Sequence, residues 1–596
     1  MPPSSSGSIE TLQQVTIRLK DQDSEIVFAN LSLQERMLST GHFSFVWKND
    51  FNDAYADDQE RFIQEYIGKE LVISFEDHHT FKGIILEIHF FRNDGLTQEF
   101  NISGQGLGVK LQDQAQSASY YKKNLQHIID DALRGVPSNA LSIDNSPKNT
   151  SEQFYTVQYQ ETDFAFLSHL AIRFGEWFYY DGEQLVFGKL NDDALSLQAE
   201  SDVYSASLSS QLTPLSIHAT SYDNFQGEVM NHQSSNPSTS GLLNALSTAS
   251  GSAYDRTPSK MLHLAQASTS EVLGNRVDLE VQARTARMIL YSAKSRSSEV
   301  KVGRVIKIVS GNKSSEYIVV SVTHSSAAHQ TYHNEFVAIP KSVTVPHYTD
   351  ANWYPKCESQ VATVTSNEDD KGHDRIKVHF PWQQDGEDTP WLKVATPQAG
   401  EGRGFRMIPE VDEEVIIGFE RNNAEKPYVI GAMFNAKGKS GSGTSSNNLK
   451  SIQTKSGNRL ELNDEDGSIT VTDKGGNILT LDGSGKITLK CSDSLLIDAA
   501  NNIELKSQNI KLNASVSVDI AGKTTVDVAA NSVVTKATTI SNEATADNTL
   551  KSNATVTIDG VNTSVKGSAT AKVEGAMLDL SGTGITNVKG GILNLN

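Results

Sequence analysis

The feature that most constrains this chain is a repeat of apolar residue pairs in its C-terminal part. Each pair has the form apolar–x–apolar, and seven successive pairs start 8, 8, 8, 7, 8 and 8 residues apart. Such alternation predicts short β-strands with one apolar face. Self-similarity at a short, fixed period indicates a β-helix or another solenoid. The pairs are Leu479 with Leu481, Ile487 with Leu489, Leu495 with Ile497, Ile503 with Leu505, Ile510 with Leu512, Val518 with Ile520 and Val526 with Val528.

A repeat of eight residues is too short for one chain to cover its own apolar face. At about 3.3 Å per residue, eight residues span about 26 Å, hardly a full turn of a three-faced β-helix. If three chains share each turn, every repeat supplies one face and all the pairs meet on a common axis. Each side chain buried there contributes about 1.5–3 kcal/mol, which an isolated chain forgoes. We expect an intertwined trimeric β-helix, or β-prism, with the seven pairs as its core; a single-chain solenoid and a low-complexity tail are the alternatives.

The composition of the repeat region fits a narrow shared interior. From Asn435 to Asn596 there is no Phe, Tyr, Trp, Pro or His. Small and β-branched side chains suit a thin β-structured core better than rings do. The apolar repeat is weaker over 535–550, because Thr and Ala replace the Ile and Leu pairs there. We expect the register to be least firmly set in that stretch.

The remaining bulk properties exclude several classes of protein. A chain of 596 residues should hold several domains. A net charge of −20 argues against nucleic acid and anionic membranes as partners. The two cysteines, Cys357 and Cys491, form no disulfide framework or CxxC metal motif. We expect no signal peptide and no stable membrane insertion, hence synthesis in the cytoplasm and export by a route other than general secretion.

Four regions follow from composition and pattern. Residues 1–345 are β-rich, with helical patterns at 120–135 and 162–175 and a Ser/Asn/Gly-rich segment, 232–254, expected to be a mobile loop. Residues 352–435 contain five short strand patterns that suggest a small OB-type barrel. Residues 436–450 are expected to be a Gly/Ser linker, and residues 451–596 hold the repeat.

Motifs in the first two regions resemble those of a known family. "YTVQYQETDFAFLSHLAIRFGEWFYYDGEQLVFG" (155–188) resembles the hub motif of VgrG proteins, the spikes of type VI secretion systems, and of related phage-tail and contractile injection hubs. "EYIVVSVTH" and "YHNEFVAIP" resemble the strands that close that hub. "DRIKVHFPWQ", "WLKVATPQAGEGRGFRMIPEVDEEVIIGFE" and "KPYVIGAMFN" resemble the family's OB domain. The resemblance covers essentially the whole chain.

The resemblance implies a mainly β fold: a hub of two barrel-like lobes with a few helices, an OB-fold neck and a trimeric needle. It also implies a homotrimer whose hub docks on a hexameric tail-tube protein and contacts baseplate proteins. When a sheath contracts, such a spike leaves the cell, punctures a target membrane and carries effectors with it. A PAAR-repeat protein usually caps the needle. The corresponding apex here is Gly590, Gly591, Ile592, Leu593, Asn594, Leu595 and Asn596.

No motif in the sequence predicts catalysis, a cofactor or a metal. "EDHH" (76–79) and "GHD" (372–374) fall beside strands and are interpreted as polar turns. "GKS" (438–440) and "GKT" (522–524) lack the upstream Gly of a phosphate loop. A β-helical glycan depolymerase needs paired carboxylates, and an adhesive fibre needs a receptor-binding tip. The repeat region supplies scattered acidic residues without aromatic neighbours, so we expect a structural spike rather than either alternative.

Overall fold

The structure, a computed structural model, describes most of the chain. The described residues are 15–48, 56–76, 79–93, 97–137, 139–223, 227–237, 239–255, 260–265, 267, 269–326, 332–441, 443 and 445–595. They divide into two units, Met1–Ser492 and Asp493–Asn596.

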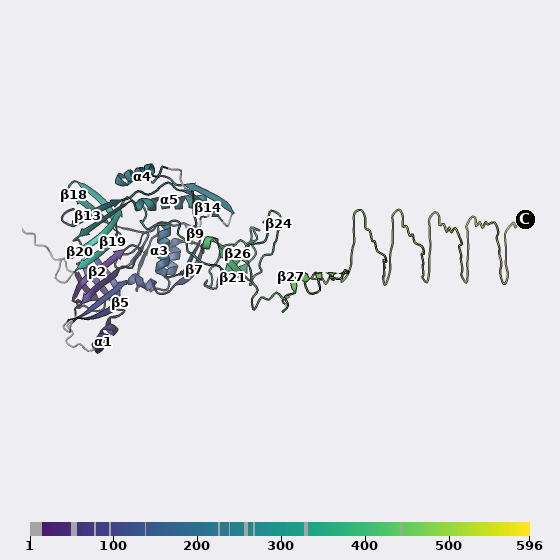
Figure 1. Cartoon of the computed structure of the whole chain (residues 1–596), viewed down its shortest axis with the longest axis horizontal. Coiled ribbons are helices and arrows are strands. Elements are labelled where there is room, and N and C mark those ends of the chain that lie inside the picture. Colours follow the sequence, from purple (N-terminus) through teal and green to yellow (C-terminus); the bar gives the residue numbers. More distant parts are fainter. Residues whose placement is uncertain are drawn as a thin grey trace, which may run out of the picture. The chain divides into compact units, whose positions relative to one another are not determined.

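A twelve-stranded sheet forms the framework of the first unit (Figure 1). Its strand order is β1-β4-β5-β6-β3-β2-β19-β20-β17-β13, with β18 paired to β19 and β12 paired to β18. All pairings are antiparallel except β12 with β18. The strands are β1 (Val15–Leu19), β2 (Phe28–Arg36), β3 (His42–Trp47), β4 (Glu70–Phe75), β5 (His79–Asn93), β6 (Thr97–Gly106), β12 (Asn191–Gln198), β13 (Val203–Ser210), β17 (Ile289–Ser295), β18 (Arg304–Ser310), β19 (Lys313–Ser326) and β20 (His333–Pro340).

The pairing of β2 with β19 is the seam between two lobes. Glu35 lies opposite Val322 across this seam, and Leu33 lies opposite His324. One hydrophobic core packs on the N-terminal side of the seam, and a second is built from residues of the later strands. Two cores beside one continuous sheet agree with the two barrel-like lobes expected from the sequence.

Three smaller sheets complete the hub. β8 (Ile143–Asn145), β10 (Phe178–Tyr180) and β11 (Leu185–Phe187) form one. β14 (His218–Asp223), β15 (Glu228–Gln233) and β16 (Lys260–Leu262) form another. β7 (Gln116–Asn124) pairs with β9 (Glu152–Glu161).

The helices of the described residues are α1 (Ala56–Tyr66), α2 (Leu125–Ala132), α3 (Asp163–Phe174), α4 (Gly241–Ala253) and α5 (Ser270–Ala286). The prediction of α3 is confirmed: the Thr162 side chain accepts a hydrogen bond from the Ala165 N–H, and Gly175 ends the helix with φ of 68°. The helix predicted over 120–135 is shorter, because its first five residues belong to β7.

The prediction of a mobile loop over 232–254 is wrong. Residues 241–253 form α4, and Leu243 is buried in the second core with Leu246 packed against it. Tertiary packing of a Leu-bearing face overrides the low helix propensity of Ser and Gly. The 17-residue helix α5 is a second element that the sequence patterns do not predict.

The OB region is a four-stranded sheet of order β22-β21-β25-β26. The strands are β21 (Gln360–Ser366), β22 (Lys377–His379), β25 (Glu414–Phe419) and β26 (Pro427–Ala432). The fifth predicted strand joins only through the bridges Ile376–Leu392 and Val394–Val429. A short hairpin, β23 (Ala399–Gly400) and β24 (Arg403–Gly404), lies between these elements in the chain. The core of this domain also contains Tyr155 and Val157 of β9, so hub and OB domain share it.

The first part of the predicted repeat is an antiparallel meander within one chain. Its strands are β27 (Leu449–Gln453), β28 (Arg459–Asn463), β29 (Ile469–Thr472), β30 (Ile478–Leu481) and β31 (Ile487–Lys490), paired in that order. β27 starts inside the range expected for the linker. Two predicted pairs face each other here, Leu479 opposite Leu489 and Leu481 opposite Ile487.

The second unit is an open chain. Residues 493–595 contain no assigned helix or strand, and every one of them is exposed. Backbone bends recur at 500–501, 508, 515–516, 523–524 and 531, a spacing of seven to eight residues that matches the sequence period. In Figure 1 this unit is drawn as a trace that runs back and forth at regular intervals.

The single chain differs here from the strands that the sequence predicts. The repeats that end in Ile497, Leu505, Leu512, Ile520 and Val528 keep the predicted period but form no strand within one chain. The physical reason is that a strand is assigned only where its backbone groups have partners. Successive repeats of this unit do not supply such partners to one another.

Gly104 provides a test of the hub packing. A Cβ there would lie 1.9 Å from the Ile84 carbonyl oxygen and 2.5 Å from the Phe43 ring. We expect Gly104→Ala to lower the free energy of unfolding by about 1–3 kcal/mol, because a backbone oxygen must move. Gly135→Ala, where a Cβ meets nothing within 4 Å, is the matched control. Equal thermal unfolding midpoints for the two variants would contradict this packing.

Candidate functional site

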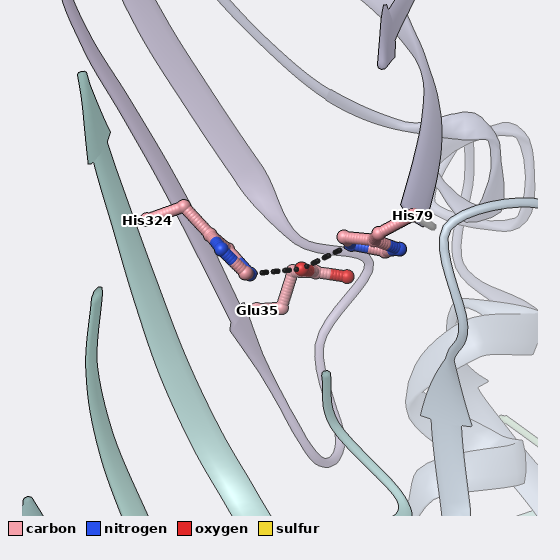
Figure 2. A group of neighbouring side chains, drawn as sticks. All are labelled: Glu35, His79 and His324. Atoms are coloured by element: carbon pink, nitrogen blue, oxygen red, sulfur yellow. Dashed lines mark hydrogen bonds and ion pairs between the residues drawn. The ribbon is translucent and has the colours of Figure 1, made fainter. Parts of the chain in front are cut away.

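A buried carboxylate between two imidazoles lies at the seam between the lobes (Figure 2). Glu35 comes from β2, His79 opens β5 and His324 comes from β19. One oxygen of Glu35, Oε2, is 2.9 Å from His79 Nε2 and 3.0 Å from His324 Nε2. The three side chains are at most 2% exposed. This Glu35–His79–His324 cluster is therefore shielded from solvent on all sides.

A chain of hydrogen bonds fixes the protons of the cluster. Asn334 Nδ2 donates to the Tyr332 hydroxyl at 2.9 Å, and that hydroxyl lies 2.6 Å from His324 Nδ1. If both histidines donate through Nε2 to Glu35, His324 Nδ1 accepts from Tyr332 and each link has one donor. Burial opposes the charge of Glu35, but His79 and His324 outweigh it and hold the pKa of Glu35 far below its ordinary range. Burial lowers the pKa of His324.

The same three residues are a potential metal-ligand set. Their ligand atoms lie within 4.8 Å of one another, and two histidines with one carboxylate is a donor set that zinc uses. The nitrogen–oxygen distances are hydrogen-bond lengths, however. A divalent ion with one carboxylate and two neutral imidazoles would also leave a net positive charge in a site shielded from solvent. We interpret the cluster as a hydrogen-bonded joint between the lobes.

Sequence reasoning misses this cluster. The motif "EDHH" is interpreted from the sequence as a turn, and Glu76 does lie in a turn after β4, while residues 77–78 lie outside the described residues. His79 is instead buried. Its partner Glu35 is 44 residues away, and His324 is 289 residues from Glu35, so only strand pairing brings them together.

The other polar and aromatic motifs are structural. Asp369 forms two hydrogen bonds with the Arg375 guanidinium, at 2.7 and 2.9 Å, and holds the turn that contains "GHD". This contact, more than any other, holds the pKa of Asp369 well below its ordinary range. The aromatic residues of "GEWFYYDG", from Trp177 to Tyr180, are buried in the hub cores.

The repeat residues predicted to form a shared core are exposed in the single chain. In the second unit, the first residue of each pair is 51–56% exposed; these residues are Leu495, Ile503, Ile510, Val518 and Val526. The second residue of each pair is 62–73% exposed; these residues are Ile497, Leu505, Leu512, Ile520 and Val528. The exposure has a physical reason, because no second apolar face of the same chain lies over these side chains. Burial of the pairs by other copies stays a prediction.

The pairs of the meander are also incompletely covered. Leu479 and Leu481 are each 36% exposed, Leu489 is 54% exposed and Ile487 is 69% exposed. Their strands are paired, but only one sheet is present, so its apolar face has no layer packed against it. Contiguous apolar surface of this kind is rare on soluble monomers and marks an interaction surface.

The apolar side chains of the predicted apex are also exposed. Leu593 is 51% exposed, and Ile592 and Leu595 are each 85% exposed. Asn596 lies outside the described residues. Over the described part of the chain, every helix is too short or too polar to cross a membrane.

The joint should make the protein sensitive to acid. Because burial lowers the His324 pKa below 6.5 and the Glu35 pKa lies below 4.5, the unfolded chain binds more protons than the folded chain as pH falls. Stability should therefore decline from about pH 6.5 downward. At pH 7, Glu35→Gln should cost about 3 kcal/mol, since it breaks a buried pair.

The difference in free energy of unfolding between wild type and Glu35→Gln should shrink below about pH 4.5. Glu35 of the unfolded chain becomes protonated there, so the stabilisation that the ionised carboxylate gives the folded chain is progressively lost. Denaturant unfolding from pH 7 to pH 4 measures both effects. Glu25→Gln is the control, because Glu25 pairs with Arg18 on the surface, where ion pairs contribute little. A difference that does not change with pH would count against the proposed proton arrangement.

Two family models match the chain. Residues 53–330 match the phage tail baseplate hub (GPD), which corresponds to the two-lobed part of the first unit. Residues 360–434 match the type VI secretion system/phage-baseplate injector OB domain, which corresponds to the sheet of β21, β22, β25 and β26. The OB fold expected from five strand patterns is thus confirmed.

Characterised relatives agree with these matches. The chain is 24% identical to the actin cross-linking toxin VgrG1 of Vibrio cholerae over 47% of its own length and 28% of that protein. It is 32% identical to the type VI secretion system spike protein VgrG4b of Pseudomonas aeruginosa over 18% of its own length and 14% of that protein. The matched part therefore spans less than a third of either relative.

A solved structure of a complex that contains a VgrG protein shares the fold. The Francisella PdpA–VgrG complex in its lidded form aligns with a TM-score of 0.53 and 10% identity, covering 81% of this chain and 80% of that one. The hub and OB models match in the order that the sequence motifs predicted. The chain thus carries a phage-baseplate hub domain followed by an injector OB domain, and it is similar over these domains to VgrG spike proteins of type VI secretion systems.

Proposed function

We propose that this chain is the homotrimeric, non-enzymatic hub and spike of a contractile injection system, with residues 493–596 forming an intertwined needle. The observation that carries the proposal is the exposed apolar repeat of the second unit. Its pairs recur with the period of the backbone bends, so one apolar face repeats along the whole segment. A partner that repeats with the same period would cover it, and another copy of the same segment has that property.

Burial and backbone pairing both favour such sharing. Half or more of each paired side chain of this unit is exposed in one chain, so covering it gains about 1–2 kcal/mol. Among described residues 493–595, no backbone–backbone hydrogen bond forms within the chain. Backbone N–H and C=O groups require partners wherever they leave water. Strands from two further copies would supply these partners and the apolar cover together.

The hub suits a threefold assembly that meets a sixfold tube. Each chain contributes two lobes beside one sheet, so three chains present six lobes to a hexameric tail-tube protein. The chain would be made in the cytoplasm, contact baseplate proteins and carry effectors into a target cell when the sheath contracts. The Francisella relative occurs in a complex with PdpA, and this supports a role for VgrG-type hubs as docking platforms.

The glycan depolymerase and the adhesive fibre are the weaker interpretations of the repeat. The acidic residues of the second unit are spread along it, and the sequence offers no aromatic ring there to stack on a sugar. A rigid needle accounts for the same features without a catalytic site. It would puncture a membrane by concentrating force at its tip, and it would carry a PAAR-repeat cap on Gly590–Asn596.

The oligomeric state tests the shared needle. Light scattering of the purified chain should give the mass of a trimer. The double variant Ile503→Asp, Ile510→Asp should lower the temperature at which the trimer dissociates, because it places charges on the shared axis. Asn502→Asp, Asn509→Asp adds the same charges one residue earlier and should leave that temperature nearly unchanged. A monomeric wild type, or equal loss in both variants, would refute the proposal.

Removal of residues 586–596 tests the apex. We expect the trimer to survive, because most of the repeat is intact, and binding of a PAAR-repeat protein to be lost. Pull-down with the cap protein and light scattering of the same sample measure the two properties separately. Undiminished cap binding would show that the cap docks elsewhere.

A further inference from the structure

Two buried guanidinium groups meet where the hub contacts the OB domain. Arg173 lies in the last turn of α3, and Arg276 lies in the middle of α5. They are 2% and 7% exposed. Their guanidinium carbons lie 5.1 and 5.4 Å from the centre of the Phe174 ring, so both pack against one side chain. Buried arginines normally have a charged partner.

One carboxylate serves these two arginines. Glu425 of the OB domain forms an ion pair with Arg173 through Nη1. Arg276 forms no ion pair with any residue that the structure describes, and its hydrogen bond is a long one, 3.4 Å, to the Ala351 carbonyl oxygen. The C-terminal end of α3 also favours the charge of Arg173, whereas Arg276 has no helix terminus beside it. The pair therefore carries one positive charge without a partner.

Neighbouring groups do not remove this excess. Burial lowers the pKa of Arg276 to about 9, with a further contribution from Arg173, so Arg276 remains protonated at neutral pH. Burial lowers the pKa of His263 to about 3, so that ring is neutral. Lys426 is also buried; burial lowers its pKa, and the carboxylates of Glu420 and Asp223 oppose that shift, so they balance Lys426 rather than the two arginines.

A cavity of about 140 Å³ lies beside the two arginines. Arg173, Arg276 and Phe174 line it together with the polar residues Asn149, Ser151 and Asn275, while Glu425 is not part of the lining. Glu152 also lines the cavity, but it is exposed and pairs with neither arginine. Arg173 Nε is buried and has no hydrogen-bond partner among the described residues. The cavity thus holds unused donors and a positive charge.

We propose that this cavity binds a small oxyanion, such as phosphate, sulfate or a carboxylate, between Arg173 and Arg276. Guanidinium groups present paired N–H donors that match the oxygens of such anions. The anion would neutralise the unpaired charge and tie α3, α5 and the Glu425 loop together. It would be a free ion or the carboxylate of another copy of the chain. The proposal does not depend on the function of the assembled spike.

Thermal unfolding of the full chain tests the site. Phosphate at about ten times its dissociation constant should raise the unfolding midpoint of wild type by about 1–2 °C over chloride at equal ionic strength. Arg276→Gln should abolish this shift, and Arg276→Lys, which keeps the charge, should retain part of it. Arg284→Gln is the matched control, because Arg284 lies on the same helix but pairs with Glu280.

Equilibrium dialysis with labelled phosphate separates the two sources. Uptake of one phosphate per chain by wild type and none by Arg276→Gln would identify a free anion. A second outcome would identify a carboxylate of another copy: wild type takes up no phosphate, Arg276→Gln weakens the trimer, and Arg276→Lys restores it. Absence of uptake with unchanged assembly and midpoint in Arg276→Gln would overturn the proposal. So would an equal phosphate shift in wild type, Arg276→Gln and Arg284→Gln.

Discussion

The organisation of this protein depends on a strand repeat that one chain cannot bury. Residues 493–595 expose an apolar pair every seven to eight residues and form no backbone pairing of their own. A segment with that period is stable where its apolar face is covered and its backbone groups are paired. Identical copies meet both needs at every repeat. In the proposed assembly, the hub would present the segment in several copies.

Apart from the β27–β31 meander and the excess charge at Arg276, the first unit pairs its main polar and apolar groups within one chain. The β2–β19 pairing makes one sheet of two lobes, and the Glu35–His79–His324 cluster closes the seam between them. The OB domain is joined to the hub by a shared core around Tyr155, and by Arg173 paired with Glu425. Buried ion pairs contribute little net stability, but removing one partner is costly, so they fix a geometry.

What the chain encodes locally could be predicted from the sequence. The Thr162 cap and Gly175 stop define α3, and alternating patterns locate the OB strands. The helix α4 escapes prediction because its apolar face, Leu243 and Leu246, lies in a sequence rich in Ser and Gly. The helix is stabilised by packing of these two residues on the second core, which the local sequence does not show. The Glu35–His79–His324 cluster escapes because its members are brought together by strand order rather than by spacing.

The two units differ in where their charged side chains lie: several of those in the first unit are buried, and those of the second unit are exposed. In the first unit Glu35 and Arg173 are buried with charged or protonated partners inside the fold, and the excess charge at Arg276 stands out against them. In the second unit Glu504, Asp519 and Asp527 each occupy the middle position of an apolar pair and are exposed to water, where no partner is needed. A repeat that keeps its charges off the apolar face leaves that face free to meet another copy.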